Sequence, residues 1–490
     1  MRSRGAFPIV VMALLFALGA IVEALQMSSL SSLSNADMWW HLSTGRWIIQ
    51  HHQLPQTGIF SQLPGVPWIA SSWAYDLFLA LAYRILQTRA IPALLMGFRL
   101  VLAVVVFLLA GGMRGRFWLA VVLSAVAQYV LGGFQPTPAY CSIILFGVEL
   151  LLLNESRRAG SIKTLYWLPF LFLAWANLHT QFVYGVVLLL LFLSSTLLSQ
   201  DGRQEAPERK GRSPVCPKWV GLITGLSLVA TLVTPYFYQP YKVFLTGVTS
   251  AANAYLPDYK AMSFHQPQHY VLLLLTMAAF FALGINRSRD LFQITLLAGC
   301  ALLSFYAQRD IWLVALASIA VMGEANGRDE TGTESEQGLS SNHQPLLAAS
   351  LAVLTLVFVV AFRVPASREM LMAKVARNYP VAASAFIRDR HLPQPLFNAY
   401  EWGGFLTCYL PEYPVAIDSR TDLYGDRDLI QYSKVMNADL PYTEYPALTG
   451  ARTILLPRHS LMGEALSTVP AFHVAYSDDV ATVLTRGSDD

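Results

Sequence analysis

The feature that most constrains this chain is a series of apolar runs, most of them long enough to cross a lipid bilayer. A helix needs about 20 residues to cross about 30 Å of hydrocarbon, and somewhat fewer when it packs inside a bundle. The runs predict a polytopic α-helical membrane protein with about eleven spans. The expected spans lie near 8–25, 91–110, 117–133, 138–153, 164–180, 182–199, 219–235, 269–285, 290–307, 308–322 and 344–363.

Composition supports this interpretation and excludes other classes. The chain is 54% hydrophobic and only 13% charged, whereas soluble domains carry about 25% charged residues. A net charge of +3 gives no reason to expect a nucleic-acid partner. No two of the four cysteines have the spacing of metal ligands, so neither a metal centre nor a disulfide framework is indicated.

Charge distribution predicts how the chain is oriented. Five basic clusters fall on one side of the membrane only if the apolar stretch Trp73–Leu86 does not cross it. We therefore expect a helix over 73–88 that lies at the outer interface, a cytoplasmic N-terminus and an extracytoplasmic C-terminus in a bacterial inner membrane. The clusters are Arg2/Arg4, Arg114/Arg116, Arg157/Arg158/Lys163, the arginines and lysines of 203–218, and Arg287/Arg289.

Domain organisation follows from the same pattern. Residues 1–363 are predicted to form the transmembrane domain, with a first outer loop at 26–90 and a polar inner loop at 323–343. Residues 364–490 show short apolar strands alternating with helices, which predicts an extracytoplasmic α/β domain. In that tail we expect helices over 379–390, 401–410, 426–436 and 461–468, and strands over 395–398, 415–417, 453–456, 472–476 and 481–484.

The first outer loop begins with a cluster of chemically capable side chains. Asp37, Trp40, His41 and Arg46 follow the first span directly. On a helix Asp37 and His41 are one turn apart and share a face. A carboxylate beside an imidazole can act as a general base or as a pair of metal ligands. The alternative is an interfacial tryptophan belt on a helix that Asn35 or Asp37 caps.

Polar side chains between the later spans are a second set of candidates. Asn177 and His179 lie where two spans meet the outer face, and they can hold a phosphate or a sugar hydroxyl. Arg309 can neutralise a lipid phosphate, because a guanidinium matches phosphate geometry. The alternatives are a tight turn that satisfies its own backbone, and a local pair between Arg309 and Asp310.

The tail adds a third set. Asp418, Arg420 and Asp422 follow the expected strand 415–417 at its carboxyl end, where open α/β sheets bind ligands. These residues can bind an acceptor, or they can form a salt-bridged structural loop. The adjacent pair Gly403 and Gly404 indicates close packing of backbones.

Three motifs resemble an uncharacterised group of bacterial multispanning proteins related to the GT-C glycosyltransferase superfamily. The first is Asp37-Met-Trp-Trp-His-Leu-Ser-Thr-Gly-Arg-Trp-Ile, followed by His51-His-Gln-Leu-Pro. The second is Trp175-Ala-Asn-Leu-His-Thr-Gln-Phe-Val-Tyr-Gly. The third combines Asn398-Ala-Tyr-Glu-Trp-Gly-Gly-Phe-Leu with Ile417-Asp-Ser-Arg-Thr-Asp-Leu-Tyr-Gly. The resemblance thus extends from the first outer loop into the tail.

This resemblance implies an inverting glycosyltransferase that takes a sugar from a polyprenyl-phosphate donor at the outer face. In such proteins an acidic residue of the first outer loop acts as base or helps to hold a divalent metal, here Mg or Mn. By position Asp37 is the matching catalytic residue. The other candidates would bind substrate: Trp40, His41, Arg46, Asn177, His179, Arg309, Asp418, Arg420 and Asp422. The partners implied are the lipid-linked sugar donor and membrane lipids, with the acceptor open.

The chain also departs from the group. Relatives have His-Glu-Trp where this chain has Ser71-Ser72-Trp73, and an acidic residue near Thr57. The departure favours an alternative, a non-catalytic GT-C-like scaffold or polyisoprenoid-binding subunit. A transporter is disfavoured, because the two halves show no inverted repeat.

Overall fold

The computed structural model describes residues 35–114, 117–201, 215–325 and 368–487. By contacts these residues form two compact units. We call residues 93–238 and 258–325 the bundle unit. Residues 35–92, 239–257 and 368–487 are the loop–tail unit. The expected spans near 8–25 and 344–363, and most of the polar loop 323–343, lie outside the described residues.

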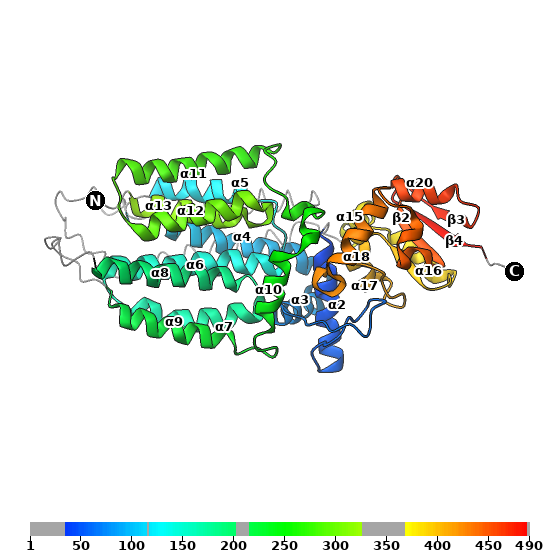
Figure 1. The fold of residues 1–490 in the computed structure, drawn as a ribbon, viewed down its shortest axis with the longest axis horizontal. Helices are drawn as coiled ribbons and strands as arrows, with labels where there is room; N and C mark the ends of the chain where they lie inside the picture. Colours follow the sequence, from blue (N-terminus) through cyan, green and yellow to red (C-terminus); the bar gives the residue numbers. More distant parts are fainter. Residues whose placement is uncertain (1–34, 115–116, 202–214, 326–367, 488–490) are drawn as a thin grey trace. The chain divides into compact units, whose positions relative to one another are not determined.

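The bundle unit is made of helices that run side by side (Figure 1). Its central element is α13, whose side chains are buried all round from Trp312 to Val321. Such a helix belongs to the interior of a bundle. Helices α11 and α12 pack against α13, and α7 packs against α9. The bounds are α4 Ala90–Leu109, α5 Phe117–Val130, α6 Pro138–Ala159, η3 Lys163–Trp167, α7 Leu168–Leu178, α8 Phe182–Asp201, α9 Pro217–Thr231, η5 Pro257–Tyr259, α11 Pro267–Ile285, α12 Leu291–Tyr306, η6 Gln308–Asp310 and α13 Ile311–Ala325.

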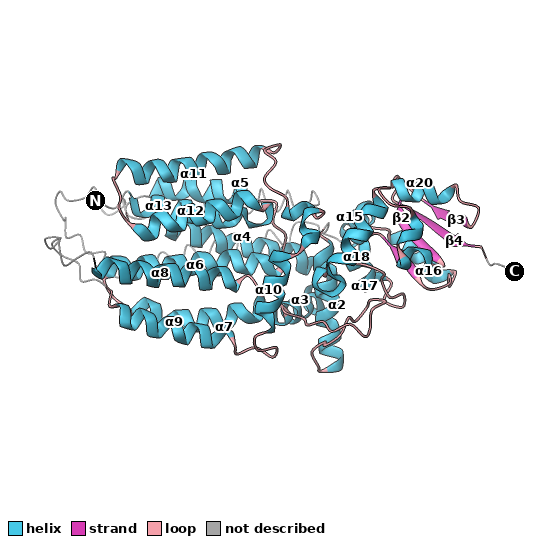
Figure 2. Ribbon diagram, in the orientation of Figure 1, coloured by secondary structure: helices cyan, strands magenta, loops and turns pink. Residues whose placement is uncertain are grey.

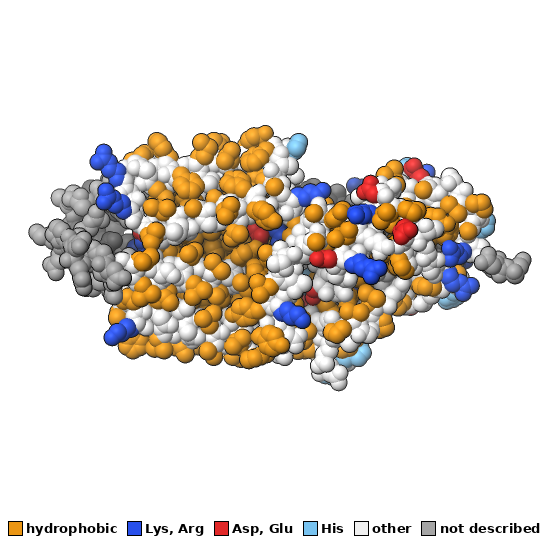
Figure 3. Space-filling model, in the orientation of Figure 1, with side chains coloured by type: hydrophobic (Ala, Val, Ile, Leu, Met, Phe, Trp, Pro, Cys, Tyr) orange, Lys and Arg blue, Asp and Glu red, His pale blue; other side chains and the backbone are white. Residues whose placement is uncertain are grey.

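The helices of this unit coincide with the described spans that the apolar runs predict. Three helical stretches are long and apolar enough to cross a membrane, namely Trp73–Leu109, Pro138–Ala159 and Pro267–Ile285. Shorter apolar helices cover Leu119–Val130, Phe182–Leu198 and Leu291–Tyr306. Large apolar side chains cover the outer surface of these helices (Figure 3). The outward-facing apolar surface is what a lipid environment requires.

One end of the bundle unit is basic. Arg157 at the end of α6 pairs with Asp290 before α12 and with Glu324 at the end of α13. These contacts place the loops that carry Arg157, Arg158, Arg287 and Arg289 at the same end. The opposite end carries Asn177, His179 and Arg309.

Exposed aromatic side chains mark both ends of the unit. Tyr166, Trp167 and Trp219 are exposed at the basic end. At the other end the exposed rings are those of Phe237, Tyr238, Tyr270 and Tyr306. Two such belts are typical of the two interfaces of a membrane.

The loop–tail unit contains a small mixed sheet with the strand order β1-β2-β4-β3. Strand β1 is parallel to β2, with Leu396 opposite Thr453, while the other pairs are antiparallel. Figure 2 shows the strands in magenta with helices around them. The bounds are β1 Leu396–Asn398, β2 Thr453–Pro457, β3 Phe472–Ser477, β4 Ala481–Arg486, α15 Arg368–Asn378, α16 Val381–Asp389, α17 Tyr400–Tyr409, α18 Thr421–Met436, η8 Tyr442–Glu444, α19 Pro446–Thr449 and α20 Leu461–Ser467.

Two segments distant in sequence complete this unit. The first loop contributes α2 Ala36–His51, α3 Trp73–Leu86 and η2 Gln87–Arg89. The second outer loop contributes α10 Gln239–Thr249 and η4 Ala251–Ala254. The carboxylate of Asp426 accepts hydrogen bonds from Ser250 and from the Ala251 amide, which fastens the second loop to the tail. The tail thus forms one compact unit with both loops.

Segment 415–417 is not a strand of the sheet, contrary to the sequence prediction. Val415 makes a single parallel bridge with Ser61 of the first loop. The side chain of Asn398 supports the same segment by accepting from the Ala416 amide and donating to the Ile417 carbonyl. A side-chain amide and a loop from another part of the chain therefore replace the ladder partners that a strand would have.

Candidate functional site

Helix α2 positions the first group of candidate residues. The side chain of Asn35 accepts a hydrogen bond from the Asp37 amide at 2.8 Å, so Asn35 caps the helix. Asp37 lies in the first turn, where a negative charge is favoured by the helix dipole. Trp40 and His41 follow one turn later. The half-buried carboxylate of Asp37 and the ring of Tyr379 from the tail are close enough to interact electrostatically.

His41 pairs with a residue that the sequence did not single out as its partner. Its Nδ1 lies 2.5 Å from Oδ1 of Asp76 on α3. His41 is 5% exposed and Asp76 is fully buried. The carboxylate that contacts this imidazole is therefore Asp76, 35 residues away, and not Asp37 on its own helix.

Glycine makes this pairing possible. A Cβ at Gly45 would lie 2.0 Å from the Asp76 carbonyl oxygen, so only a residue without a side chain lets α2 approach α3 here. On the other side of α2, a Cβ at Gly404 would lie 2.2 Å from the Ala36 carbonyl oxygen. The close packing that Gly403 and Gly404 predict is confirmed, and α2 is held between α3 and α17.

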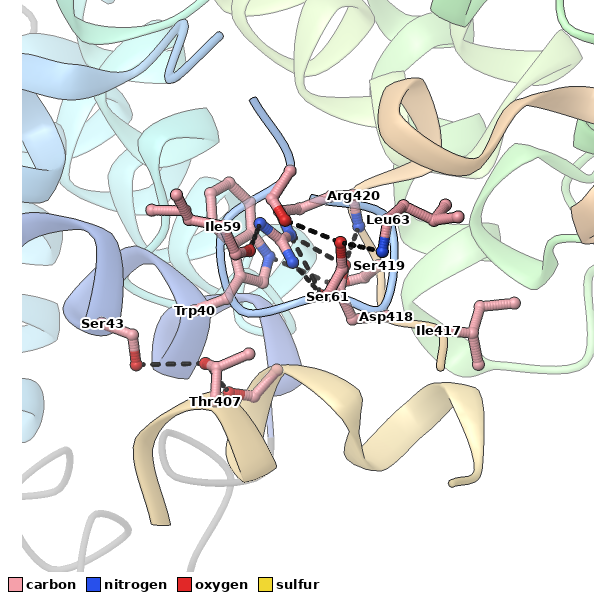
Figure 4. Close-up of polar contacts among 12 residues, drawn as sticks. Trp40, Ser43, Ile59, Ser61, Leu63, Thr407, Ile417, Asp418, Ser419 and Arg420 are labelled. Carbon is pink, nitrogen blue, oxygen red and sulfur yellow. Dashed lines mark hydrogen bonds and ion pairs between the residues drawn. The ribbon is translucent and has the colours of Figure 1, made fainter. Parts of the chain in front are cut away.

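Trp40 links the first loop to the tail. Its Nε1 donates to Oγ of Ser419 at 3.1 Å (Figure 4). Its ring stacks on His41 with centroids 3.6 Å apart and meets Trp68 edge-on at 6.1 Å. The indole therefore covers one face of the imidazole.

Arg46 lies further along α2 in a different environment. Its guanidinium donates to Sγ of Cys408 at 3.2 Å and lies over the Tyr83 ring, 4.7 Å from the centroid. Burial raises the pKa of the Cys408 thiol, although the charge of Arg46 opposes the shift. Arg46 is thus engaged with groups of α3 and α17.

The tail loop 418–422 forms a buried ion pair. Asp418 is fully buried and accepts from Nε and Nη2 of Arg420, the latter at 2.6 Å. The remaining Nη1 donates to the Ile59 carbonyl of the first loop at 2.8 Å (Figure 4). Burial lowers the pKa of the Arg420 guanidinium, but the charge of Asp418 outweighs burial and holds that pKa above its usual value. The pair satisfies itself and anchors loop 59–61.

Asp422 differs from Asp418 because part of its side chain reaches solvent. The surrounding protein nevertheless disfavours the charged form, and burial raises the pKa of this carboxyl to about 6. The charge of Arg420 and a hydrogen bond from Trp68 oppose the shift. Of the three tail candidates, Asp422 is the one that a ligand from solution can reach.

The bundle unit holds the second group of candidates at its non-basic end. Nδ1 of His179 lies 2.8 Å from Oγ of Ser142, which also accepts from Trp175. Asn177 donates to the carbonyls of Leu173 and Val233. These bonds tie the turn between α7 and α8 to Ser142 of α6 and to the Val233 carbonyl.

Arg309 lies at the same end. Its guanidinium lies over the Tyr259 ring at 4.3 Å, with Nε 3.7 Å from Oδ1 of Asp310. Asp310 also accepts from Tyr184 at 2.8 Å and from Gln181 at 3.3 Å. About a quarter of the Arg309 side chain stays exposed, so the residue keeps access to a ligand.

The structure thus sorts the sequence candidates into two groups. Asp37, Trp40, His41, Arg46, Asp418, Arg420 and Asp422 lie in the loop–tail unit, and Asn177, His179 and Arg309 lie in the bundle unit. Trp68, Ser419 and Asp76 are not among the candidates that the sequence analysis named. A buried aspartate on an otherwise apolar helix was the available signal for Asp76.

No metal site fits the described ranges. Within them, no three His, Cys, Asp or Glu side chains lie close enough together to hold a metal ion. In these ranges Asp37 is therefore not joined by two further such side chains that would complete a metal site. We therefore derive no step that uses Mg or Mn.

Comparison with known structures identifies the fold. The chain matches the apo crystal structure of the Archaeoglobus fulgidus oligosaccharyltransferase with a TM-score of 0.54 and 10% identity, covering 93% of this chain and 70% of that chain. It also matches AglB, the archaeal oligosaccharyltransferase from Archaeoglobus fulgidus, in complex with an inhibitory peptide and a dolichol-phosphate. There the TM-score is 0.51 at 10% identity, over 91% of this chain and 69% of that one.

A weaker likeness links the chain to ArnT from Cupriavidus metallidurans bound to undecaprenyl phosphate. It has a TM-score of 0.48 and 13% identity and covers 97% of this chain and 98% of that chain. No protein-family model and no curated protein matches the chain. The two oligosaccharyltransferase structures carry the comparison, and at their identities they show the fold alone.

The chain thus has the fold of these two oligosaccharyltransferase structures. The fold that the resemblance to GT-C glycosyltransferases implies is therefore confirmed. A mainly helical membrane protein with a small sheet towards the C-terminus is confirmed as well, while the number of spans stays a prediction.

Proposed function

We propose that this chain is a membrane glycosyltransferase that moves a sugar from a polyprenyl-phosphate donor to an acceptor at the outer face of a bacterial inner membrane. The observation that carries the proposal is the match to oligosaccharyltransferase structures over more than nine-tenths of the chain. One of these structures contains a dolichol-phosphate. A polyprenyl-phosphate is the corresponding class of donor lipid.

Topology supports the outer face. Basic residues gather at one end of the bundle unit, beyond the belt of Trp167 and Trp219. By the positive-inside rule this end is cytoplasmic. Asn177, His179 and Arg309 then face outward. With eleven spans the C-terminal tail is extracytoplasmic too.

Helix α3 fits an interfacial position. Its buried side includes Tyr75, Asp76 and Leu79, whereas Phe78, Leu81 and Ile85 are exposed along the opposite side. Gln87, with φ of 53°, interrupts the helical path before α4. A helix with an exposed apolar side and a break before the next helix can lie along the membrane surface.

The assigned roles follow the chemistry of the transfer. Asp37 supplies the first-loop carboxylate at the reacting centre, and Arg309 supplies positive charge for the leaving lipid phosphate. His179, Asn177 and Asp422 offer hydrogen bonds to sugar or acceptor hydroxyls. Trp40, Arg46, Asp418 and Arg420 hold the first loop to the tail within the loop–tail unit.

The test is transfer by the full chain reconstituted in lipid, with radiolabelled polyprenyl-phosphate hexoses as donors and envelope fractions as acceptors. Asp37→Asn is expected to abolish transfer while the protein still inserts and elutes as a folded species. Asp439→Asn, a change at an exposed aspartate of the tail, is the matched control and keeps full activity. Undiminished transfer by Asp37→Asn would remove the role assigned to this residue.

The second candidate function is a non-catalytic, polyisoprenoid-binding subunit. Ser71 and Ser72 favour it, because they stand where the resembling group has His and Glu. It predicts saturable binding of polyprenyl-phosphate hexose by the wild-type chain with no turnover at any pH. Transfer by the wild-type chain decides against it.

A further inference from the structure

The loop–tail unit contains a histidine–aspartate pair with the geometry of a catalytic base. The roles proposed above for the transfer reaction do not include this pair. His41 on α2 and Asp76 on α3 are 2.5 Å apart, and both are almost entirely buried. A carboxylate that accepts a hydrogen bond from Nδ1 of an imidazole fixes the orientation of the ring and its tautomer. Nε2 is then the nitrogen that can accept a proton. This arrangement recurs where histidine acts as a base.

Nε2 of His41 is available for this role. The described contacts give it no protein partner, and it is not among the side-chain atoms that are both buried and unpartnered. The ring is otherwise enclosed, with 5% of His41 exposed. The second oxygen of Asp76, Oδ2, is by contrast buried without a hydrogen-bond partner, so the carboxylate faces the imidazole alone.

Two aromatic rings border the imidazole. Trp40 covers one face of the imidazole at 3.6 Å, and an aromatic face attracts a cation. Tyr75 meets the ring edge-on at 5.6 Å. An imidazolium formed at His41 would thus lie between an indole and the Asp76 carboxylate.

The other charged groups nearby lie on α2 itself and in the tail. Asp37 is one turn earlier on α2, and Arg46 is engaged with Cys408 of α17. Towards the Asp418–Arg420 pair, Trp40 donates to Ser419, and the Arg420 guanidinium lies over the Trp68 ring, 4.9 Å from its centroid. Burial raises the pKa of the Asp76 carboxyl, and among the described residues His41 is the ionisable group that opposes this shift.

We propose that His41, held by Asp76, accepts the proton of the acceptor during glycosyl transfer. This inference rests on the proposed function. The acceptor O–H proton moves to Nε2 as the acceptor oxygen forms a bond to the anomeric carbon. The bond from that carbon to the phosphate oxygen breaks, and its electron pair leaves with the polyprenyl phosphate. Asp76 balances the charge of the imidazolium, which returns its proton to water.

This assignment divides the work between two residues of α2. Near neutral pH an imidazole is a better matched base than an exposed carboxylate. Asp37, one turn away, is then free to stabilise the positive charge that develops at the anomeric carbon. Asp76 is a positioning residue, since it acts through His41.

The first experiment needs no activity. The full chain in lipid is treated with diethyl pyrocarbonate, which modifies neutral imidazole, and each histidine is followed by peptide mass spectrometry from about pH 5 to 8. His41 is expected to be modified in the wild type. In Asp76→Asn the midpoint of its modification moves about 1 pH unit lower, because the imidazolium loses its counter-charge.

His51 is the matched control on the same helix. It stacks on Trp47 at 4.3 Å, as His41 stacks on Trp40, but its Nδ1 contacts a backbone carbonyl at 2.9 Å and not a carboxylate. Its modification should be the same in both proteins. If His41 stays unmodified at every pH, or if its midpoint does not move in Asp76→Asn, the pair does not act as proposed.

The second experiment follows transfer against pH. His41→Gln is expected to lower the transfer rate about 10²- to 10⁴-fold. In Asp76→Asn, a near-isosteric change that keeps the packing, the acid limb of the profile should move lower by about 1 unit. An unmoved limb would contradict the inference even if the rate falls. Absence of transfer by the wild type would count against the proposed function instead, and the labelling result would still decide on the pair.

Discussion

The Asp418–Arg420 pair shows how one contact can decide the role of three candidate residues. In the sequence these residues fit either an acceptor site or a structural loop. In the structure the carboxylate and the guanidinium satisfy each other, and the remaining donor holds the Ile59 carbonyl of the first loop. We therefore assign this pair to the architecture of the site and leave Asp422 for contact with a ligand.

Removing one partner of this ion pair should destabilise the protein strongly. Asp418→Asn leaves a buried guanidinium without its counter-charge, which costs about 3–5 kcal/mol. The expected result is a clearly lower midpoint of thermal unfolding, measured by fluorescence-detected size exclusion in detergent.

The control is the exposed pair between Arg458 and Asp479, 3.1 Å apart in the same unit. Asp479→Asn should leave the midpoint nearly unchanged, since exposed pairs contribute about 0–1 kcal/mol. Equal midpoints for Asp418→Asn and the wild type would show that the buried pair does not hold the loop.

Helix α2 is the element on which the site depends, because every first-loop candidate lies along it. Helix α2 is packed closely on both sides. Its Gly45 lies against α3, and Gly404 of α17 lies against the first turn of α2. The spacing of α2 from α3 sets the distance between His41 and Asp76. A backbone position without chemistry of its own thus controls the geometry of the pair.

Gly45→Ala is expected to separate α2 from α3. The added methyl group would meet the Asp76 carbonyl at 2.0 Å, so the backbone has to move, at a cost of about 1–3 kcal/mol. Both the unfolding midpoint and the transfer rate should fall. Gly65→Ala, where nothing lies within 4 Å of the added methyl, should leave both unchanged. A wild-type rate for Gly45→Ala would mean that the reaction does not depend on this spacing.

Neither compact unit is one continuous stretch of the sequence. The bundle unit consists of apolar helices with exposed aromatic rings at both ends and one basic end, whereas the loop–tail unit gathers three segments from distant parts of the chain. Asp426 shows how this is achieved, by binding the start of η4 from a helix 175 residues away.

The proposed orientation of the whole chain can be tested with cysteine labelling. Cys216 is exposed at the basic end of the bundle unit, and Asp439→Cys places a thiol on an exposed position of the tail. In spheroplasts a membrane-impermeant maleimide should label residue 439 but not Cys216, and lysis should make Cys216 reactive. Mass spectrometry of the labelled peptides provides the measurement. Labelling of Cys216 before lysis would reverse the assigned orientation.

Much of the architecture follows from periodicity and is visible in the sequence. Apolar runs of bilayer length predicted the helices of the bundle unit, and alternation of short strands and helices predicted the tail. Basic loops predicted that Arg157 and the region of Asp290 lie at one end. These features are local, because burial of an element depends on its own pattern of side chains.

Only the tertiary structure decided which side chains meet. His41 and Asp76 are 35 residues apart, and Trp40 and Ser419 are 379 apart. No local sequence pattern predicts such a pair, because each residue is compatible with its own helix or loop whether or not its partner is present. Gly45 hints at close approach but does not name the neighbour. By itself the sequence predicted the helices of the bundle unit, the tail and the motifs, while the packing of α2 between α3 and α17 decided that the imidazole would pair with Asp76.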